Sequence, residues 1–264
     1  MFDVFDLPFV QRGLWEILLL SIPAGLLGTW IVLRGMAFFA HATGTAAFPG
    51  LVVADGVGFA APFGALAAAG VFAGAVVVLG GRRRTGYDSL TALALVGALA
   101  AGVLLASDVF ESGARVDTLL FGSLLVLEPR DLVLAGVAGV VAAVCSVVLG
   151  ERWLARAFDP DAARALGQRS RWPDLVLAGL VAFAVVASLS AVGALLVTAL
   201  FVVPAATARL VTRRLGTWQW TSIGLAAAEG VAGLWLSVET NTPPGAAISV
   251  VAGAGFAVAA VVRA

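Results

Sequence analysis

The chain has 264 residues, of which 61% are hydrophobic and 12% are charged, and its formal net charge is zero. Soluble domains carry about twice that charged fraction, so the composition excludes a water-soluble globular protein and indicates one that lies in a lipid bilayer. All sixteen basic residues are arginine, and sixteen acids balance them, which argues against a nucleic-acid partner.

Apolar segments long enough to cross a bilayer follow one another along almost the whole chain. A spanning helix needs roughly 20 mostly apolar residues. Nine candidates fit, with eight or ten left open because the chain is irregular around Pro49 and Pro62. They are residues 17–33, 35–54, 56–81, 89–107 and 132–150, two helices within the uncharged stretch 175–208 with a break near 188–193, then 215–238 and 243–262. The sequence therefore predicts an all-α fold, a polytopic membrane bundle of about nine transmembrane helices.

Nine spans place the two termini on opposite sides of the membrane, and the arginines indicate the orientation. With the N-terminus outside, thirteen of the sixteen arginines fall on inner segments, and only Arg12, Arg115 and Arg130 fall outside. Because inner loops are enriched in positive charge, we expect an outer N-terminus, a cytoplasmic C-terminus and a cytoplasmic loop at 151–172. Residues 118–127 are too short to cross and predict a re-entrant or interfacial helix. The spacing of Gly70 and Gly74 predicts a helix face that a neighbouring helix approaches closely.

Residue types that several kinds of catalysis require are missing. A Walker-type phosphate loop needs a lysine, and the chain contains none. His41 is the single histidine, so histidine-based hydrolytic sites are poorly supported. The single cysteine, Cys145, lies in an apolar run and is best interpreted as a small buried side chain. The sequence thus favours a transporter or a membrane scaffold over an enzyme, and any ATP-driven step would use an ATPase on another chain.

Five segments, in order along the chain, resemble one protein family. Residues 32–50 contain an Arg-x-Met-Ala-Phe turn, followed by a helix that closes with Phe-Pro-Gly. Residues 120–125 read Leu-Phe-Gly-Ser-Leu-Leu, and residues 158–167 read Phe-Asp-Pro-Asp-Ala-Ala-Arg-Ala-Leu-Gly. Residues 192–209 and 244–253 complete the set. Together they are similar to the permease family of bacterial zinc, manganese and iron ABC importers.

The resemblance implies a function and a set of partners. The chain would be a single permease domain, 1–264, in the bacterial inner membrane, and it would import divalent transition-metal ions, with zinc or manganese as the expected substrate. It would form a homodimer, receive the metal from an extracytoplasmic metal-binding protein, and be driven by a separate ATP-binding cassette ATPase subunit. The chain itself would bind no cofactor, and the partner would use the ATP. Two alternatives stay open: a permease for a non-metal solute, and a membrane scaffold that transports nothing.

The segment 158–167 also has a physical interpretation of its own. Asp159 suits the N-cap of a short helix, Pro160 its first position, and Gly167 its C-terminal end. A capped surface helix would explain these features without any partner. The resemblance implies instead a coupling helix that receives the movement of the ATPase, through Phe158, Asp159, Pro160, Arg164, Leu166 and Gly167.

The second span carries the expected metal path. Where the family has an aspartate and, four residues later, a histidine that handle the metal, this chain has His41 and Thr45. Residues four apart share a helix face, and a neutral imidazole is a good ligand for late divalent metals, whereas a threonine hydroxyl is a poor one. Three accounts stay open. In the first, His41 ligates a metal, and the His41 side chains of two copies can bind the same ion across the two-fold axis of a dimer. In the second, the path serves another substrate. In the third, His41 only hydrogen-bonds a neighbouring helix.

Two acids and two prolines are further candidates for the path. Asp55 lies fourteen residues beyond His41, which in one continuous helix returns it to within about 40° of the same face, near the outer mouth. Glu229 is an acid deep within a span, a position that usually has a functional reason. Pro49 and Pro204 predict helix kinks of the kind that mark moving or pathway-lining helices.

Overall fold

The structure, a computed structural model, describes residues 8–80, 87–109, 122–123, 127–159, 162–163, 170–194 and 196–263. Every regular element in these ranges is a helix, which confirms the all-α prediction. The elements are α1 (Pro8–Leu33), α2 (Ala37–Ala46), α3 (Phe48–Val57), α4 (Ala61–Gly80), α5 (Tyr87–Leu104), the π-helical turn η2 (Leu105–Val109), α7 (Pro129–Phe158), α9 (Trp172–Val192), α10 (Val197–Phe201), α11 (Val203–Val211), α12 (Leu215–Thr240) and α13 (Pro244–Arg263).

Eight segments of the described chain are long and apolar enough to cross a membrane, within the expected range of eight to ten. One of them is formed by α2 and α3 together. The difference from nine arises in 175–208. There α9 is a full-length span, but α10 and α11 have only five and nine residues. The predicted break is confirmed: α9 ends at Val192 because Gly193 adopts φ 82°, a left-handed value that only glycine takes easily.

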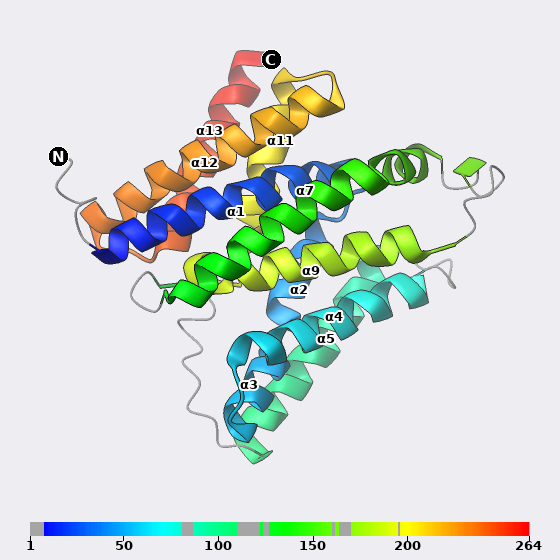
Figure 1. The fold of residues 1–264 in the computed structure, drawn as a ribbon, viewed down its shortest axis with the longest axis vertical. Coiled ribbons are helices and arrows are strands. Elements are labelled where there is room, and N and C mark those ends of the chain that lie inside the picture. The colour runs from blue at the N-terminus through cyan, green and yellow to red at the C-terminus, as the bar shows by residue number, and fades with distance from the viewer. Residues whose placement is uncertain are drawn as a thin grey trace.

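The helices form a central group with one further group on each side (Figure 1). In the middle lie α1, α7 and α9; α11, α12 and α13 lie on one side, and α2 to α5 on the other. The two central spans α1 and α9 are the most deeply buried. Their core includes an edge-to-face pair of indoles, Trp30 of α1 and Trp153 of α7, whose ring centroids are 5.5 Å apart.

Contacts between helices show which ends lie together. α12 runs antiparallel to α1, because Gly25 meets Ile223 while Ile17 meets Gly230. Hydrogen bonds and ion pairs join the C-terminal ends of α1, α4 and α7 to the start of α9, and the Arg263 guanidinium donates to the Arg209 carbonyl oxygen at 3.3 Å. The C-terminal ends of α1, α4, α7, α11 and α13 therefore lie at one end of the bundle. The pair α10–α11 returns the chain to that end as a broken ninth crossing.

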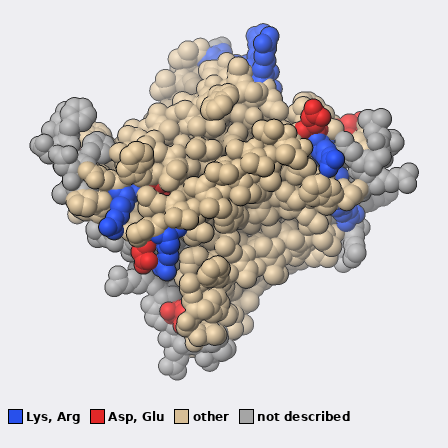
Figure 2. All heavy atoms as spheres, viewed as in Figure 1, with Lys and Arg blue, Asp and Glu red and all other residues tan. Residues whose placement is uncertain are grey.

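This end, which we call the arginine-rich end, carries most of the described positive charge. It holds Arg34, Arg152, Arg156, Arg171, Arg209, Arg213, Arg214 and Arg263, whereas Arg12 and Arg130 of the described chain lie at the opposite end. Figure 2 shows the charged side chains at the edges of the visible face, with a broad uncharged band between them. An uncharged band between two charged rims is the surface that a bilayer requires.

Glycines do permit close helix packing, but at other positions than the sequence predicts. Gly70 and Gly74 have no atom within 4 Å of the place where a Cβ would stand, so the expected close approach there is wrong. The tight contacts are at Gly28, whose Cβ would stand 2.1 Å from the Phe201 carbonyl oxygen, and between Gly50 and Gly64, where each Cβ would stand about 2 Å from the other carbonyl oxygen. Backbone atoms of α1 and α10, and of α3 and α4, are thus in direct contact.

Candidate functional site

The path from α1 into α2 is a fixed turn that places His41 and Thr45. At the end of α1 the Met36 amide donates to the Ile31 carbonyl oxygen at 2.8 Å and the Gly35 amide to that of Val32 at 3.3 Å, while Gly35 takes φ 66°. These are the two hydrogen bonds of a Schellman motif, in which a left-handed glycine closes a helix. α2 begins at the next residue, Ala37, so no further loop residues separate the two helices.

His41 and Thr45 lie on the same face of α2, as their spacing predicts. His41 is half-buried, and Thr45 is buried with its hydroxyl 3.5 Å from the His41 carbonyl oxygen. A cavity of about 440 Å³ lies beside Thr45, and its polar lining is limited to Thr45 and Ser107. Its other lining residues are Gly44, Phe48, Leu51, Leu99, Val103, Ala106, Leu189 and Ala194. The imidazole is therefore the strongest potential metal ligand on this part of α2.

Asp55 does not continue the face that His41 and Thr45 form. α2 ends at Ala46 and α3 starts at Phe48, so the helical angle counted from His41 to Asp55 does not apply. Asp55 is exposed near the end of α3 that is remote from the arginine-rich end. Pro49 occupies the first turn of α3, where a missing amide hydrogen costs least, and Pro204 occupies the first turn of α11 in the same way. Each of these prolines therefore directly follows a helix break.

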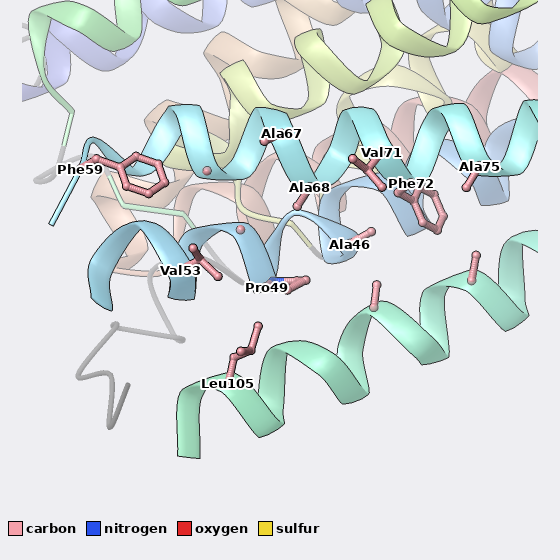
Figure 3. Close-up of a pocket in the computed structure, with 14 residues that line it drawn as sticks. Ala46, Pro49, Val53, Phe59, Ala67, Ala68, Val71, Phe72, Ala75 and Leu105 are labelled. Carbon is pink, nitrogen blue, oxygen red and sulfur yellow. The ribbon is translucent and has the colours of Figure 1, made fainter. Parts of the chain in front are cut away.

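A second cavity separates α5 from α3 and α4 (Figure 3). It measures about 510 Å³ and is lined only by apolar residues and glycines, among them Val53, Val71, Phe72 and Leu105. Without an oxygen, nitrogen or sulfur ligand on any lining side chain it offers nothing to a metal ion. α5 is also the least buried of the described membrane spans, so this cavity lies beside a helix that packs loosely on the rest of the bundle.

Glu229 lies near the middle of α12, faces α13, and is buried with 7% of its surface exposed. One carboxylate oxygen stands 3.0 Å from the place where a Cβ on Gly255 would be, so a side chain at position 255 would meet the carboxylate. Neither carboxylate oxygen has a hydrogen-bond partner within the described part of the chain. α2 packs mainly against α4, α5 and α9, whereas α12 packs mainly against α1, α11 and α13. The fold therefore does not bring Glu229 together with His41.

Replacing Glu229 with methionine is expected to stabilise the folded chain. A buried acceptor left without a partner costs about 1–3 kcal/mol, and methionine has a similar length without polar atoms. The measurement is the midpoint of thermal unfolding in detergent, which should rise by a few degrees. Glu239→Met is the matched control, because Glu239 is exposed on the same helix and its loss should leave the midpoint unchanged. An unchanged or lower midpoint for Glu229→Met would show that the carboxylate has a partner.

At the arginine-rich end the structure describes two of the six residues named for coupling, Phe158 and Asp159. α7 extends two turns beyond the expected end of the fifth span, to Phe158, which is exposed. The Asp159 side chain accepts a hydrogen bond from the Ala162 amide at 2.8 Å, the contact that an N-cap residue makes. Pro160, Arg164, Leu166 and Gly167 lie outside the described residues, as does most of 118–127.

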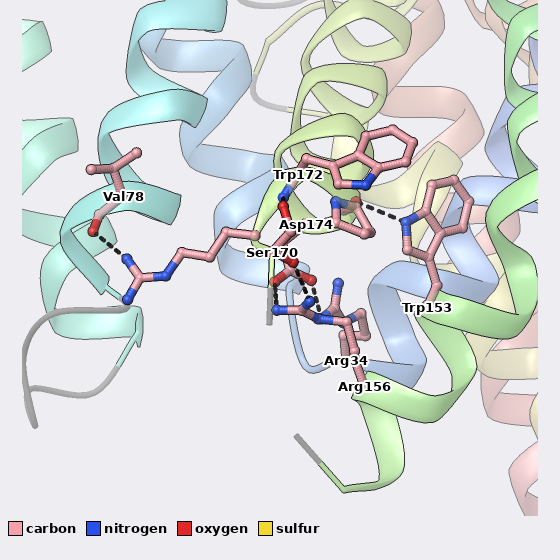
Figure 4. Close-up of polar contacts among 9 residues, drawn as sticks. Arg34, Val78, Trp153, Arg156, Ser170, Trp172 and Asp174 are labelled. Atoms are coloured by element: carbon pink, nitrogen blue, oxygen red, sulfur yellow. Dashed lines mark hydrogen bonds and ion pairs between the residues drawn. The ribbon is translucent and has the colours of Figure 1, made fainter. Parts of the chain in front are cut away.

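Sequence reasoning missed two groups of charged residues. Glu16 on α1 is fully buried and neither oxygen has a hydrogen-bond partner in the described ranges; Asp131 of α7 is close enough to interact with it electrostatically. At the other end, Asp174 in the first turn of α9 pairs with both Arg34 and Arg156 at 2.6 Å (Figure 4). These partners are far apart in sequence, so no local pattern points to them. Among the described residues no three His, Cys, Asp or Glu side chains gather as a metal site would require.

Comparisons with known proteins give a consistent result. The sequence profile of the ABC 3 transport family matches residues 6–263. The chain is 30% identical over 251 residues to the manganese transport system membrane protein MntC of Halalkalibacterium halodurans, covering 95% of this chain and 86% of that protein. It is 26% identical to a probable iron transport system membrane protein of Haemophilus influenzae, covering 98% of this chain and 95% of that protein.

Solved structures agree with the sequence comparisons. One chain of PsaBC from Streptococcus pneumoniae, determined in complex with Fab, superposes with a TM-score of 0.85 at 25% identity and covers 97% of this chain and 93% of that one. A putative metal-chelate type ABC transporter in an inward-facing conformation superposes with a TM-score of 0.64 at 17% identity, which extends the likeness of fold alone.

Proposed function

This chain belongs to the ABC 3 transport family, and we propose that it is the membrane-spanning permease subunit of a binding-protein-dependent ABC importer for divalent transition-metal ions. The observation that carries the proposal is the sequence similarity to manganese transport permeases along nearly the whole chain, and the fold match to PsaBC over the same length supports it. Manganese is the first substrate to test. Zinc, which the sequence resemblance allows equally, has less direct support from the named relatives.

The orientation in the bacterial inner membrane follows from charge. Positive residues are retained on the cytoplasmic side, so the arginine-rich end faces the cytoplasm, the start of α1 faces outward, and the chain ends inside. Phe158 and Asp159 then lie on the cytoplasmic side. An ATPase subunit binds at this end and uses the ATP, while an extracytoplasmic binding protein delivers the metal to the opposite end. The chain contributes no ATPase site and binds no cofactor.

A homodimer supplies the metal ligands that one chain lacks. A transition metal in a low-dielectric path requires several ligands, and one chain presents a single imidazole on α2. A two-fold axis close to α2 would bring two His41 side chains to the same ion. α5 is the least buried of the membrane spans, and its exposed apolar face is available to a second copy. The path therefore lies at or near the dimer interface, with α2 lining it.

The test is the metal content of cells that lack the gene. Under metal limitation, cellular manganese measured by mass spectrometry should fall several-fold in the deletion strain and return when the gene is supplied on a plasmid. If only the cellular zinc or iron content falls, the protein is still a metal importer, but its substrate is that metal and not manganese. Unchanged contents of all three metals would reject metal import and favour a permease for a non-metal solute or a scaffold without transport.

A further inference from the structure

One carboxylate joins three helices at the arginine-rich end (Figure 4). Asp174, in the first turn of α9, receives Nη2 of Arg34 on Oδ1 and Nη2 of Arg156 on Oδ2, each at 2.6 Å. The three side chains are 9–21% exposed, so the ion pairs are largely shielded from water. Charge-assisted hydrogen bonds of this length and shielding hold their partners more firmly than exposed pairs do. The three residues, called here the Asp174 clamp, fix the end of α1 and the end of α7 to the start of α9.

The clamp is also tied to the loop that precedes α9. Arg156 donates through Nη1 to the Ser170 carbonyl oxygen at 2.6 Å, and the Trp153 indole donates to that of Pro173 at 2.8 Å. Arg171 donates to the Val78 carbonyl oxygen at the end of α4, at 3.2 Å. Ser170 is therefore held by α7 and Arg171 by α4, and α9 follows them directly. A displacement of these two residues acts directly on Asp174.

Through Arg34, the clamp is also connected to the helix that carries His41. Arg34 is the residue before Gly35, and the Schellman turn at Gly35 and Met36 passes straight into α2. The middle of α2 also packs closely on the chain that follows α9: a Cβ on Gly44 would stand 3.2 Å from the Ala194 carbonyl oxygen. α2 is thus fixed at its start by the end of α1 and in its middle by that segment. Because only the turn at Gly35 and Met36 separates Arg34 from α2, the Arg34–Asp174 pair lies directly beside the start of α2.

We propose that Asp174 is a positioning residue for transport: through Arg34 it transmits displacement of Ser170 and Arg171, at the start of α9, to α2 and so to His41. The inference rests on the proposed function, because it assigns a role within an ATP-driven metal import cycle. It makes the Arg34–Asp174 pair the connection between the cytoplasmic start of α9 and the metal path. The Arg156–Asp174 pair has the separate task of holding the start of α9 on α7.

The experiment measures how many ATP molecules are hydrolysed for each manganese ion imported. The complete importer, with its ATPase and binding protein, is reconstituted in proteoliposomes, and the Arg34→Gln variant is compared with the wild type. Arg34→Gln keeps a hydrogen-bond donor, removes the charge and leaves the Arg156–Asp174 pair in place. We expect manganese uptake to fall at least about fivefold while ATP hydrolysis stays within about twofold, so that the ATP-to-metal ratio rises; fivefold is the lower end of ordinary coupling between sites. Arg34→Lys, which keeps the charge without the planar fork, should restore part of the coupling.

The matched control breaks an ion pair at the other end of the bundle. Arg130 pairs with Glu128 at 3.1 Å, and both side chains are more than half exposed, so Arg130→Gln should leave the ratio unchanged. If Arg34→Gln lowers uptake and hydrolysis in proportion, the clamp is only structural and the inference is rejected. If Arg34→Gln does not assemble, Arg34→Lys and Asp174→Glu provide the same comparison, and an unchanged ratio in both rejects it too. A wild-type importer that hydrolyses ATP but moves no metal would instead reject the proposed function.

Discussion

Replacing His41 with alanine is expected to lower manganese uptake about tenfold or more, with little change in thermal stability. The imidazole is the only nitrogen ligand of its kind in the chain, and it lies half-buried on the helix that follows the Asp174 clamp. Loss even of the groups that orient a ligand costs about 10–100-fold in metal affinity, and loss of the ligand itself should cost no less. The measurement is the initial rate of radioactive manganese uptake by proteoliposomes that contain the complete importer.

Thr45→Val is the matched control for this prediction. It removes the hydroxyl without changing the shape of the side chain, and the hydroxyl makes only a 3.5 Å contact with a carbonyl oxygen of its own helix, so uptake should change little. The double variant His41→Asp, Thr45→His restores the pair that the resembling family has at these positions and should still transport manganese. If His41→Ala transports at the wild-type rate, the histidine serves only to hydrogen-bond a neighbouring helix, and the metal path lies elsewhere.

The fold was largely predictable because a bilayer makes simple demands on a sequence. Charge-free length identifies the spans, and the break at Gly193 could be located to within a few residues because a 34-residue apolar stretch is too long for one crossing. The capping role of Asp159 was equally local: its side chain and the amide that it accepts are three residues apart. An interaction within one turn of helix, such as this one, leaves a sequence pattern.

Interactions between distant segments leave no such pattern. Asp174 and Arg34 are 140 residues apart, and nothing near either residue indicates the other. Glu16 lies near the end of its apolar run, where an acid is ordinary, yet packing buries it completely. The same limit applies to glycine. Gly70 and Gly74 have the spacing typical of close helix contact but face open space, whereas Gly28 meets the backbone of another helix. Only the arrangement of the helices distinguishes these positions.

Gly28→Ala is therefore expected to destabilise the protein severely, although it adds one methyl group. The new Cβ would stand 2.1 Å from the Phe201 carbonyl oxygen and 3.2 Å from the Ala205 side chain, so α1 and α10 would have to move apart. Over-packing of a core typically costs about 1–3 kcal/mol, and the cost is larger here because the obstacle is backbone rather than a side chain that can rotate. α1 lies at the centre of the bundle, so its displacement disturbs its packing against α7, α9 and α12 as well. The measurements are the yield of monodisperse protein in detergent and the midpoint of thermal unfolding.

The same glycine-to-alanine substitution at Gly70 should leave the stability of the protein unchanged or raise it slightly. Nothing lies within 4 Å of a Cβ at that position, and alanine favours a helix over glycine by about 1 kcal/mol. Gly70→Ala should therefore unfold at the wild-type temperature or slightly above it. If the two alanine variants behave alike, α1 and α10 are not in backbone contact. A contrast between them locates the tight contact at α1 and α10, where the broken ninth crossing packs on the helix that leads into α2.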